Sequence, residues 1–299
     1  MSEKIGCFDF HLHSEWSYDA SASVEYYFAE ASRLGLTHIA ITEHHQMDSL
    51  PEALAAAAKY PEVTYVRGAE LTVSTPYGSI DMVCLGMPEV PTPELQQVFA
   101  AYHNWQREYG DAYCYNMTQA GYPYSREERE MLLKRYRHQK TLNVQGITHV
   151  QNGVQMDYLI GKKFFPDRDA VRNVQWGENV VRKPYPAYDF VLPAVRKAGA
   201  LVFIAHPAKR YFQGKNLERM DALRELLQFD GIECSNTSVP EELTPFYREY
   251  AVKHGLLSSA GSDCHSAPGD KYQFSPSCSL GRHHGEKRWM EEIMERLQK

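Results

Sequence analysis

The sequence predicts an α/β fold built from parallel βαβ units. Two observations carry this prediction: short apolar runs recur along the chain, and patterns typical of amphipathic helices lie between most of them. Apolar runs of this length are typical of strands buried on both faces. Such units close into a barrel or open into a doubly wound sheet. The seven expected strands are Gly6–His11, Thr37–Thr42, Val63–Glu70, Ser79–Gly86, Leu201–His206, Gly231–Cys234 and Leu256–Gly261.

The helical patterns between these runs have recognisable starts and stops. In the first, Val24, Phe28 and Ala31 follow the spacing of a buried helix face, and Gly35 is suited to end the helix. In the second, Pro51 stands where proline is tolerated in a first turn, and alanines follow. Further amphipathic helices are expected over Leu217–Leu227, Glu241–His254 and Glu286–Gln298.

Residues 88–182 break this rhythm. The segment is long, rich in tyrosine and charge, and mostly helical in pattern. Ser125 and Glu128 have the spacing of a capping box before the helical pattern Met131–Tyr136. We therefore expect residues 1–87 and 183–299 to form the α/β body, and residues 88–182 to form a helical insertion that caps the active site.

The bulk composition is that of an ordinary globular protein. The 299 residues carry a net charge of −6, which argues against a broad duplex-DNA surface. The six cysteines are scattered without a CxxC pair, as expected of reduced thiols in a cytoplasmic protein. The first ten residues lack a signal peptide's apolar region, and no stretch reaches the roughly 18–20 apolar residues of a membrane span.

The first expected strand ends in two histidines. His11 and His13 are two residues apart, so in a strand both imidazoles point the same way and can reach one metal ion. Asp19 follows six residues after His13. An isolated HxH pattern is weak evidence, because single histidines in folded proteins are usually structural.

Four more of the expected strands end in comparable residues: His44 and His45, Glu70, His206, and Asp263 with His265. Each alone has an ordinary alternative, such as a helix cap, a surface ion pair or a structural histidine. Together they place metal-ligand side chains at five of seven strand ends, where parallel barrels carry their functional residues. The sequence therefore predicts a metal cluster, and its nitrogen and oxygen ligands suit two to three divalent Mn, Fe or Zn ions.

These motifs resemble the PHP family, the polymerase and histidinol phosphatase superfamily of metal-dependent phosphoesterases, and in particular its small-molecule phosphatases with a helical insertion. The matching elements are HLHSEWSYD at His11–Asp19, ITEHH at Ile41–His45, GAEL at Gly68–Leu71, FIAHP at Phe203–Pro207 and GSDCH at Gly261–His265. The resemblance implies a distorted seven-stranded (β/α) barrel and a trinuclear metal site.

The resemblance also implies a ligand set for each ion. The first ion takes His11, His13, Glu70 and Asp263; the second shares Glu70 and takes His206 and one more ligand; the third takes Asp19, His44 and His265. The missing ligand of the second ion is either Asp81, on the fourth expected strand, or His103 after it.

The expected reaction is attack on phosphorus by a metal-bridging hydroxide, which is a ready nucleophile near neutral pH. Asp263 is the candidate for handling the proton of the nucleophile, and His206 or His265 for protonating the leaving oxygen. Four residues are candidates for binding substrate: Lys209 and Arg210 after the expected strand Leu201–His206, His149 in the insertion, and His45. Helix capping is the alternative role for the two cations, and a structural role for His149.

The predicted function is hydrolysis of a phosphate ester of a small metabolite, either a nucleotide, a sugar phosphate or a cyclic phosphodiester. The alternatives are a nuclease of PHP type, a histidinol-phosphate phosphatase and a non-catalytic metal-binding module. The chain has no polymerase domain and no basic tract, so we expect neither a nucleic-acid nor a membrane partner. The oligomeric state, the native metal and the leaving group stay open.

Overall fold

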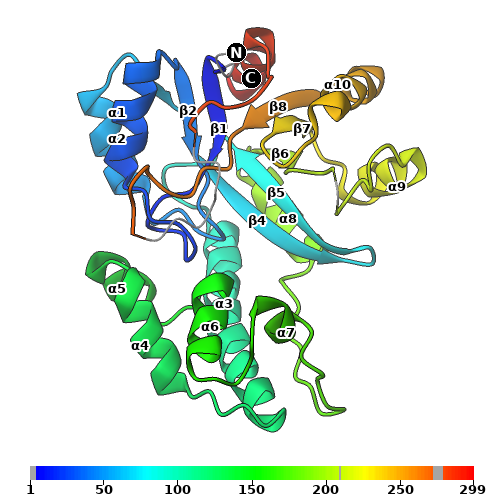
Figure 1. Cartoon of the computed structure of the whole chain (residues 1–299). Helices are drawn as coiled ribbons and strands as arrows, with labels where there is room; N and C mark the ends of the chain where they lie inside the picture. The colour runs from blue at the N-terminus through cyan, green and yellow to red at the C-terminus, as the bar shows by residue number, and fades with distance from the viewer. Residues whose placement is uncertain (1–4, 209, 272–278) are drawn as a thin grey trace.

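The computed structural model describes residues 5–208, 210–271 and 279–299. Within these ranges the strands form two sheets, with helices packed around them (Figure 1). The first sheet is parallel and contains, in order, β1 (Phe8–Leu12), β2 (His38–Ile41) and β3 (Thr64–Tyr65). The second contains, in order, β4 (Gly68–Thr75), β5 (Gly78–Leu85), β6 (Leu201–Ile204), β7 (Gly231–Asn236) and β8 (Leu257–Gly261).

Two features of these sheets differ from the sequence prediction. The run Val63–Glu70 is divided between β3 and β4, so Glu70 lies inside a strand rather than at its end. Only Pro76 and Tyr77 separate β4 from β5, and these strands pair antiparallel because a parallel crossover needs a dozen or more residues. β5 and β6 are also antiparallel, whereas β6, β7 and β8 are parallel as predicted.

The two sheets approach each other through isolated backbone bridges. Leu12 bridges to Cys264 beside β8, and His44 bridges to Glu70 in β4. Single bridges do not make a continuous ladder, so the described strands do not form a closed barrel. The mixed α/β class is confirmed, and the exact seven-stranded form stays a prediction. The first bridge lies next to predicted metal ligands and the second joins two of them, so the predicted ligands lie where the edges of the two sheets meet.

Helices cover the outside of the strands. α1 begins after Ser23, whose side chain accepts a hydrogen bond from the Tyr26 amide, and it ends at Gly35 with a φ of 77°. Gly35 suits this left-handed position because it has no Cβ. The helices of this α/β body are α1 (Val24–Leu34), α2 (Leu50–Lys59), α8 (Tyr188–Lys197), α9 (Leu217–Leu227), α10 (Thr244–Lys253) and α11 (Lys287–Leu297).

The middle of the chain forms a helical layer on one side of the strands (Figure 1). It consists of α3 (Pro93–Gln119), α4 (Arg126–Tyr136), α5 (Gln139–Gln145), α6 (Asn152–Gly161) and α7 (Arg168–Arg172). The predicted capping box is present, because Ser125 and Glu128 each accept the other's backbone N–H. Tyr124, Leu133 and Leu159 belong to an apolar cluster of this layer's own. Within the described ranges no helix is long and apolar enough to cross a membrane.

Candidate metal centre

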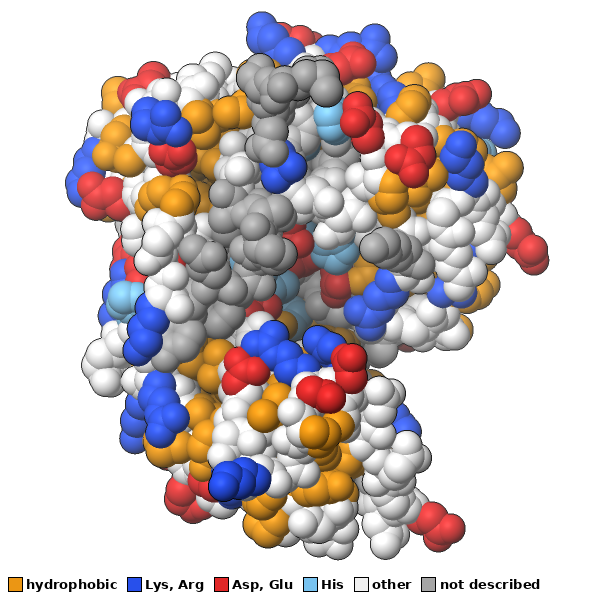
Figure 2. All heavy atoms as spheres, in the orientation of Figure 1, with side chains coloured by type: hydrophobic (Ala, Val, Ile, Leu, Met, Phe, Trp, Pro, Cys, Tyr) orange, Lys and Arg blue, Asp and Glu red, His pale blue; other side chains and the backbone are white. Residues whose placement is uncertain are grey.

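Histidine and carboxylate side chains from both sheets gather in one place. Figure 2 shows pale-blue histidines and red acidic groups in the hollow between the strand-bearing body and the helical layer. His11, His13 and Glu70 lie at the bottom and are almost completely buried. The side chains around them keep part of their surface exposed, with 21% for His206 and Asp263 and 14% for His44. The cluster is therefore closed on the protein side and open toward the hollow.

Glu70 occupies the centre of this cluster. Its Oε1 atom lies 3.1 Å from His206 Nε2 and 3.5 Å from His11 Nε2. Its Oε2 atom lies 3.0 Å from His44 Nδ1 and 3.3 Å from His13 Nε2. One carboxylate thus faces four imidazoles, two on each oxygen, as expected of a ligand shared between neighbouring ions.

The residues predicted for the first ion are in mutual contact. The Nε2 atoms of His11 and His13 lie 3.1 Å apart, and Oδ1 of Asp263 lies 3.4 Å from each of them. Ring nitrogens that converge on one another and on a carboxylate oxygen can share a cation. Asp263 reaches this position with a φ of 56°, a left-handed conformation that L residues seldom adopt. His206, with a φ of 27°, is similarly strained, and such strain concentrates at functional sites.

The residues predicted for the third ion gather beside the first group. Oδ1 of Asp19 lies 3.3 Å from His44 Nε2 and 3.8 Å from His265 Nε2. His13, His44 and His265 offer nitrogen atoms within 4.8 Å of one another. Asp19 Oδ1, His44 Nδ1 and Glu70 Oε2 are buried without a hydrogen bond of suitable geometry. Buried polar atoms are normally satisfied, so these three fit a site that completes its contacts with a cation.

Of the two candidates for the last ligand of the second ion, the structure brings Asp81 to the cluster. Oδ2 of Asp81 lies 4.0 Å from His206 Nε2, and Glu70, Asp81 and His206 form one group of converging ligand atoms. Asp81 also accepts a hydrogen bond from the Tyr211 hydroxyl. His103 is exposed on α3 and is absent from the ligand groups found among the described residues.

Two buried carboxylates that were not predicted support the cluster from behind. Glu233, in β7, places Oε1 3.0 Å from His11 Nδ1 and accepts the backbone N–H of His206 at 2.6 Å. Glu43 accepts the Ser17 hydroxyl at 2.5 Å, and Ser17 Oγ in turn lies 3.2 Å from His13 Nδ1. Metal-binding histidines usually have such a partner on their second nitrogen, which fixes the tautomer and the ring orientation.

Burial and neighbouring charge have opposite effects on the pKa values of the clustered side chains. Burial lowers the pKa of His11 and His44, yet the nearby carboxylates raise the pKa of both well above the usual value. Burial raises the pKa of Asp263, but His11 and His265 hold it well below its usual range. A raised histidine pKa favours protons on nitrogen atoms that a metal ion would need, so metal binding would be accompanied by proton release.

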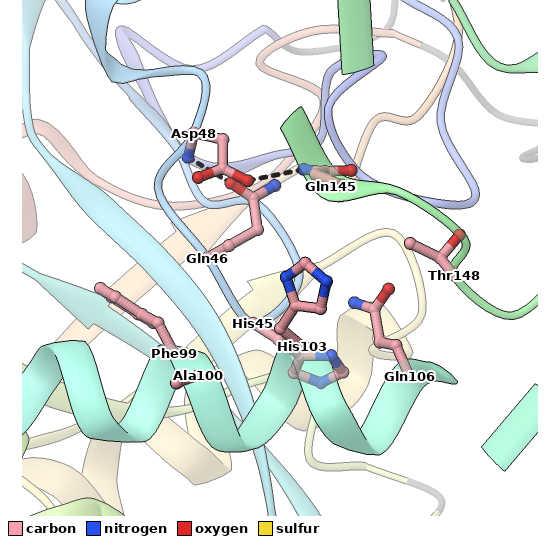
Figure 3. Close-up of a pocket in the computed structure, with 9 residues that line it drawn as sticks. All are labelled: His45, Gln46, Asp48, Phe99, Ala100, His103, Gln106, Gln145 and Thr148. Carbon is pink, nitrogen blue, oxygen red and sulfur yellow. Dashed lines mark hydrogen bonds between the residues drawn. The ribbon is translucent and has the colours of Figure 1, made fainter. Parts of the chain in front are cut away.

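The four residues predicted to bind substrate have different outcomes. His149 is buried against Tyr18, with ring centroids 3.8 Å apart. Arg210 is exposed and donates a hydrogen bond to Ser79, and Lys209 lies outside the described residues. His45 does not point its ring into the metal cluster. It stacks on Tyr102 at 4.5 Å and lines a pocket of about 180 Å³ between α3 and the loop after β2 (Figure 3).

Aromatic side chains stand beside the cluster. Tyr18 lies between His149 and the ligand candidate His44, whose ring is stacked 5.1 Å away. Trp105 stacks on Tyr185 at 4.0 Å and meets His149 edge to face at 5.7 Å. These rings come from both the α/β body and the helical layer. Trp105 is 6% exposed, whereas Tyr18 and Tyr185 keep part of their surface exposed, and the sequence pattern did not identify this group.

The chain matches the PHP domain family over residues 9–182, more than half of its length. A 3′,5′-nucleoside bisphosphate phosphatase from Chromobacterium violaceum is 25% identical over 269 residues, which cover 88% of each protein. A solved structure described as a metal-dependent phosphoesterase, from Bifidobacterium adolescentis, superposes with a TM-score of 0.75 at 22% identity, covering 99% of this chain and 98% of that one. An amidohydrolase structure from Chromobacterium violaceum, with bound sulfate and no metal, superposes with a TM-score of 0.71 at 22% identity, covering 97% of both chains.

The chain therefore belongs to the PHP family, as the strand-end motifs indicated. It is a hydrolase of the metal-dependent phosphoesterase class. The two solved structures agree with this chain in fold over almost its whole length.

Proposed function

We propose that this protein hydrolyses the phosphate ester of a nucleotide, using three divalent metal ions held by the cluster around Glu70. The observation that carries the proposal is the position of Glu70, whose two oxygens face four imidazoles beside buried ligand atoms that make no hydrogen bond of suitable geometry. Nitrogen and oxygen donors of this kind suit Mn, Fe or Zn.

Each ion has its own set of residues in this proposal. The first would be held by His11, His13, Glu70 and Asp263, the second by Glu70, Asp81 and His206, and the third by Asp19, His44 and His265. Three divalent ions and four carboxylates give the site a net charge of about +2. This local positive charge attracts a phosphate even though the protein as a whole is acidic. When bound, the ions supply a water of lowered pKa and neutralise the phosphate oxygens.

The chain's own groups have distinct tasks in this reaction. Asp263 is partly exposed to the hollow, so its carboxylate can reach the attacking water and accept its proton. His265 holds its Nδ1 2.8 Å from the Asp263 carbonyl, which orients the ring. We propose His206 or His265 as the donor to the leaving oxygen, because both reach the exposed side of the cluster.

The aromatic faces favour a nucleotide among the small phosphate esters. Tyr185 stacks on Trp105 with one face and keeps part of its surface exposed, and a base that stacks on such a ring gains about 1–3 kcal/mol. The name of the bacterial relative, a nucleoside bisphosphate phosphatase, agrees with this choice. We propose residues 88–182 as the insertion that caps the site, because Trp105 and His149 belong to it.

The test is phosphate release from a panel of substrates with Mn, Zn or Fe(II) added. The panel contains nucleoside monophosphates and bisphosphates, sugar phosphates, cyclic nucleotides, histidinol phosphate and a single-stranded oligonucleotide. We expect the highest kcat/KM for a nucleotide. A preference for a sugar phosphate or histidinol phosphate would contradict the nucleotide assignment while leaving the phosphoesterase chemistry intact. Release of nucleotides from the oligonucleotide at the highest rate would favour the nuclease alternative.

A further inference from the structure

The loop that carries Asp19 is held by the helical layer. The loop consists of residues 14–19, and the element that contacts it is the corner between α4 and α5, residues 136–140. The Tyr136 hydroxyl donates to the Tyr18 carbonyl at 2.9 Å, and Arg137 Nη2 donates to the Trp16 carbonyl at 3.3 Å. Two backbone carbonyls just before Asp19 therefore find partners on this corner.

A pair of ionic contacts joins the same two segments. Glu15 is 4% exposed, its Oε2 lies 2.9 Å from His138 Nε2, and its Oε1 lies 2.8 Å from Lys140 Nζ. A carboxylate removed from water needs such partners, since an unpaired buried charge is costly. The corner thus satisfies both the backbone and the side chain of the loop.

The α/β body holds mainly the beginning of this loop. Ser14 and Ser17 bind Glu43 through their hydroxyls, and Gln46 donates to the Trp16 carbonyl at 3.1 Å. The Tyr18 ring is enclosed by His149 of the helical layer on one side and His44 on the other. The residue next to Asp19 is therefore held largely by residues outside the α/β body.

We propose that the α4–α5 corner is a positioning element for Asp19, so that the third metal ion binds tightly only when the helical layer is docked. The inference rests on the proposed assignment of Asp19, His44 and His265 to one ion. Its physical basis is that a flexible carboxylate must be ordered before it can bind an ion, and the corner orders it in advance. Mutation of residues that support a metal ligand without binding the metal typically lowers metal affinity by about 10- to 100-fold.

The test is calorimetric titration of the full-length, metal-free protein with Mn²⁺, which gives the number of ions and the Kd of each. Tyr136→Phe removes one hydroxyl, and Glu15→Gln independently weakens the ionic contacts from the loop side. Tyr247→Phe is the matched control, because it removes a buried hydroxyl that donates to the Gly214 carbonyl at 2.8 Å within the α/β body. Asp19→Asn identifies which ion is the third.

We expect Tyr136→Phe and Glu15→Gln to weaken, by about 10-fold or more, the same ion that Asp19→Asn loses, and to leave the other ions unchanged. Tyr247→Phe should bind all ions like the wild type. Unchanged affinities in both loop variants, or an equal loss for every ion, would overturn the inference. If the wild type binds no ion, or if Asp19→Asn keeps every ion, the proposed metal assignment itself fails.

Discussion

Oε1 of Glu233 lies 3.0 Å from Nδ1 of His11, on the opposite side of the imidazole from the metal cluster. A carboxylate in this position holds the proton on Nδ1 and leaves the lone pair of Nε2 facing the other ligands. The tautomer that a metal ion needs is therefore set by a residue that does not itself reach the cluster.

The first prediction follows from this contact. Glu233→Gln should lower the affinity of the first ion by about 10- to 100-fold. The amide carries no charge, and its NH₂ group would face another N–H donor, either the His206 amide or His11 Nδ1–H. Metal titration measures the change. Glu292→Gln, which weakens an ion pair with Arg248 away from the cluster, is the control and should bind metal normally. Equal affinities in the two variants would remove the supporting role of Glu233.

The second prediction concerns Asp263. Asp263→Asn keeps the side-chain shape but cannot accept the proton of the attacking water, so kcat should fall by about 10²- to 10⁴-fold. The metal-free variant should still unfold cooperatively, at a somewhat lower temperature, because the Asp263 carboxylate contacts His11 and His265. The variant Asp221→Asn, on α9, serves as a control for a lost carboxylate. An Asp263→Asn enzyme with full metal content and normal kcat would show that another group takes the proton.

The third prediction concerns substrate choice. His149 belongs to the helical layer and contacts Tyr18 and Trp105 rather than the cluster. His149→Ala should therefore reduce kcat/KM for a nucleotide by an amount equivalent to about 1–3 kcal/mol. The loss should be small for p-nitrophenyl phosphate, which offers no base or sugar, and the metal content should be unchanged. An equal loss on both substrates together with loss of metal would show that His149 supports the metal centre, through Tyr18, rather than binding the substrate.

The fourth prediction is a pH dependence of stability. Burial lowers the pKa of His149 to about 3, whereas the usual value is 6.5. The folded protein thus keeps this histidine neutral while the unfolded chain takes up a proton below pH 6.5. Its contribution to stability is complete above pH 6.5 and is lost as the pH falls toward 3. At pH 4.5 the loss is about 2–3 kcal/mol.

Unfolding by denaturant, with a chelator present, tests this pH dependence. The free energy of unfolding of His149→Gln should fall less steeply than that of the wild type between pH 6.5 and pH 4.5. The comparison uses the slopes, because the substitution also changes the stability at neutral pH. Parallel curves for the two proteins would show that the pKa of His149 is the same in the folded and unfolded states, which contradicts the prediction.

Much of the arrangement was predictable because strand-end histidines and carboxylates have a regular place in α/β proteins. The division of Val63–Glu70 between two strands could not be predicted, because a continuous apolar run has the same pattern whether it stays in one sheet or passes from one sheet to another. The antiparallel β4–β5 pair could have been predicted, because Pro76 and Tyr77 leave no room for a crossover. The prediction of parallel strands was wrong for this pair.

The supporting carboxylates were harder to predict from sequence. Glu233 stands inside an apolar strand, and only its partner His11, more than two hundred residues away, explains why a charge is buried there. The choice between Asp81 and His103 likewise depended on packing. β5 pairs with β6 and carries Asp81 toward His206, whereas His103 lies on the exposed side of α3. Contacts of this kind depend on the tertiary arrangement rather than on local spacing.

The most direct test of the central claim is the number of metal ions bound per chain. The protein is stripped with a chelator, dialysed against Mn²⁺ or Zn²⁺ and measured by elemental analysis, with Glu70→Gln in parallel. We predict three equivalents for the wild type and a loss of at least one for Glu70→Gln, because Glu70 contacts ligands of every proposed ion. A wild-type protein that binds no metal, or a Glu70→Gln variant that binds as much as the wild type, would contradict the account.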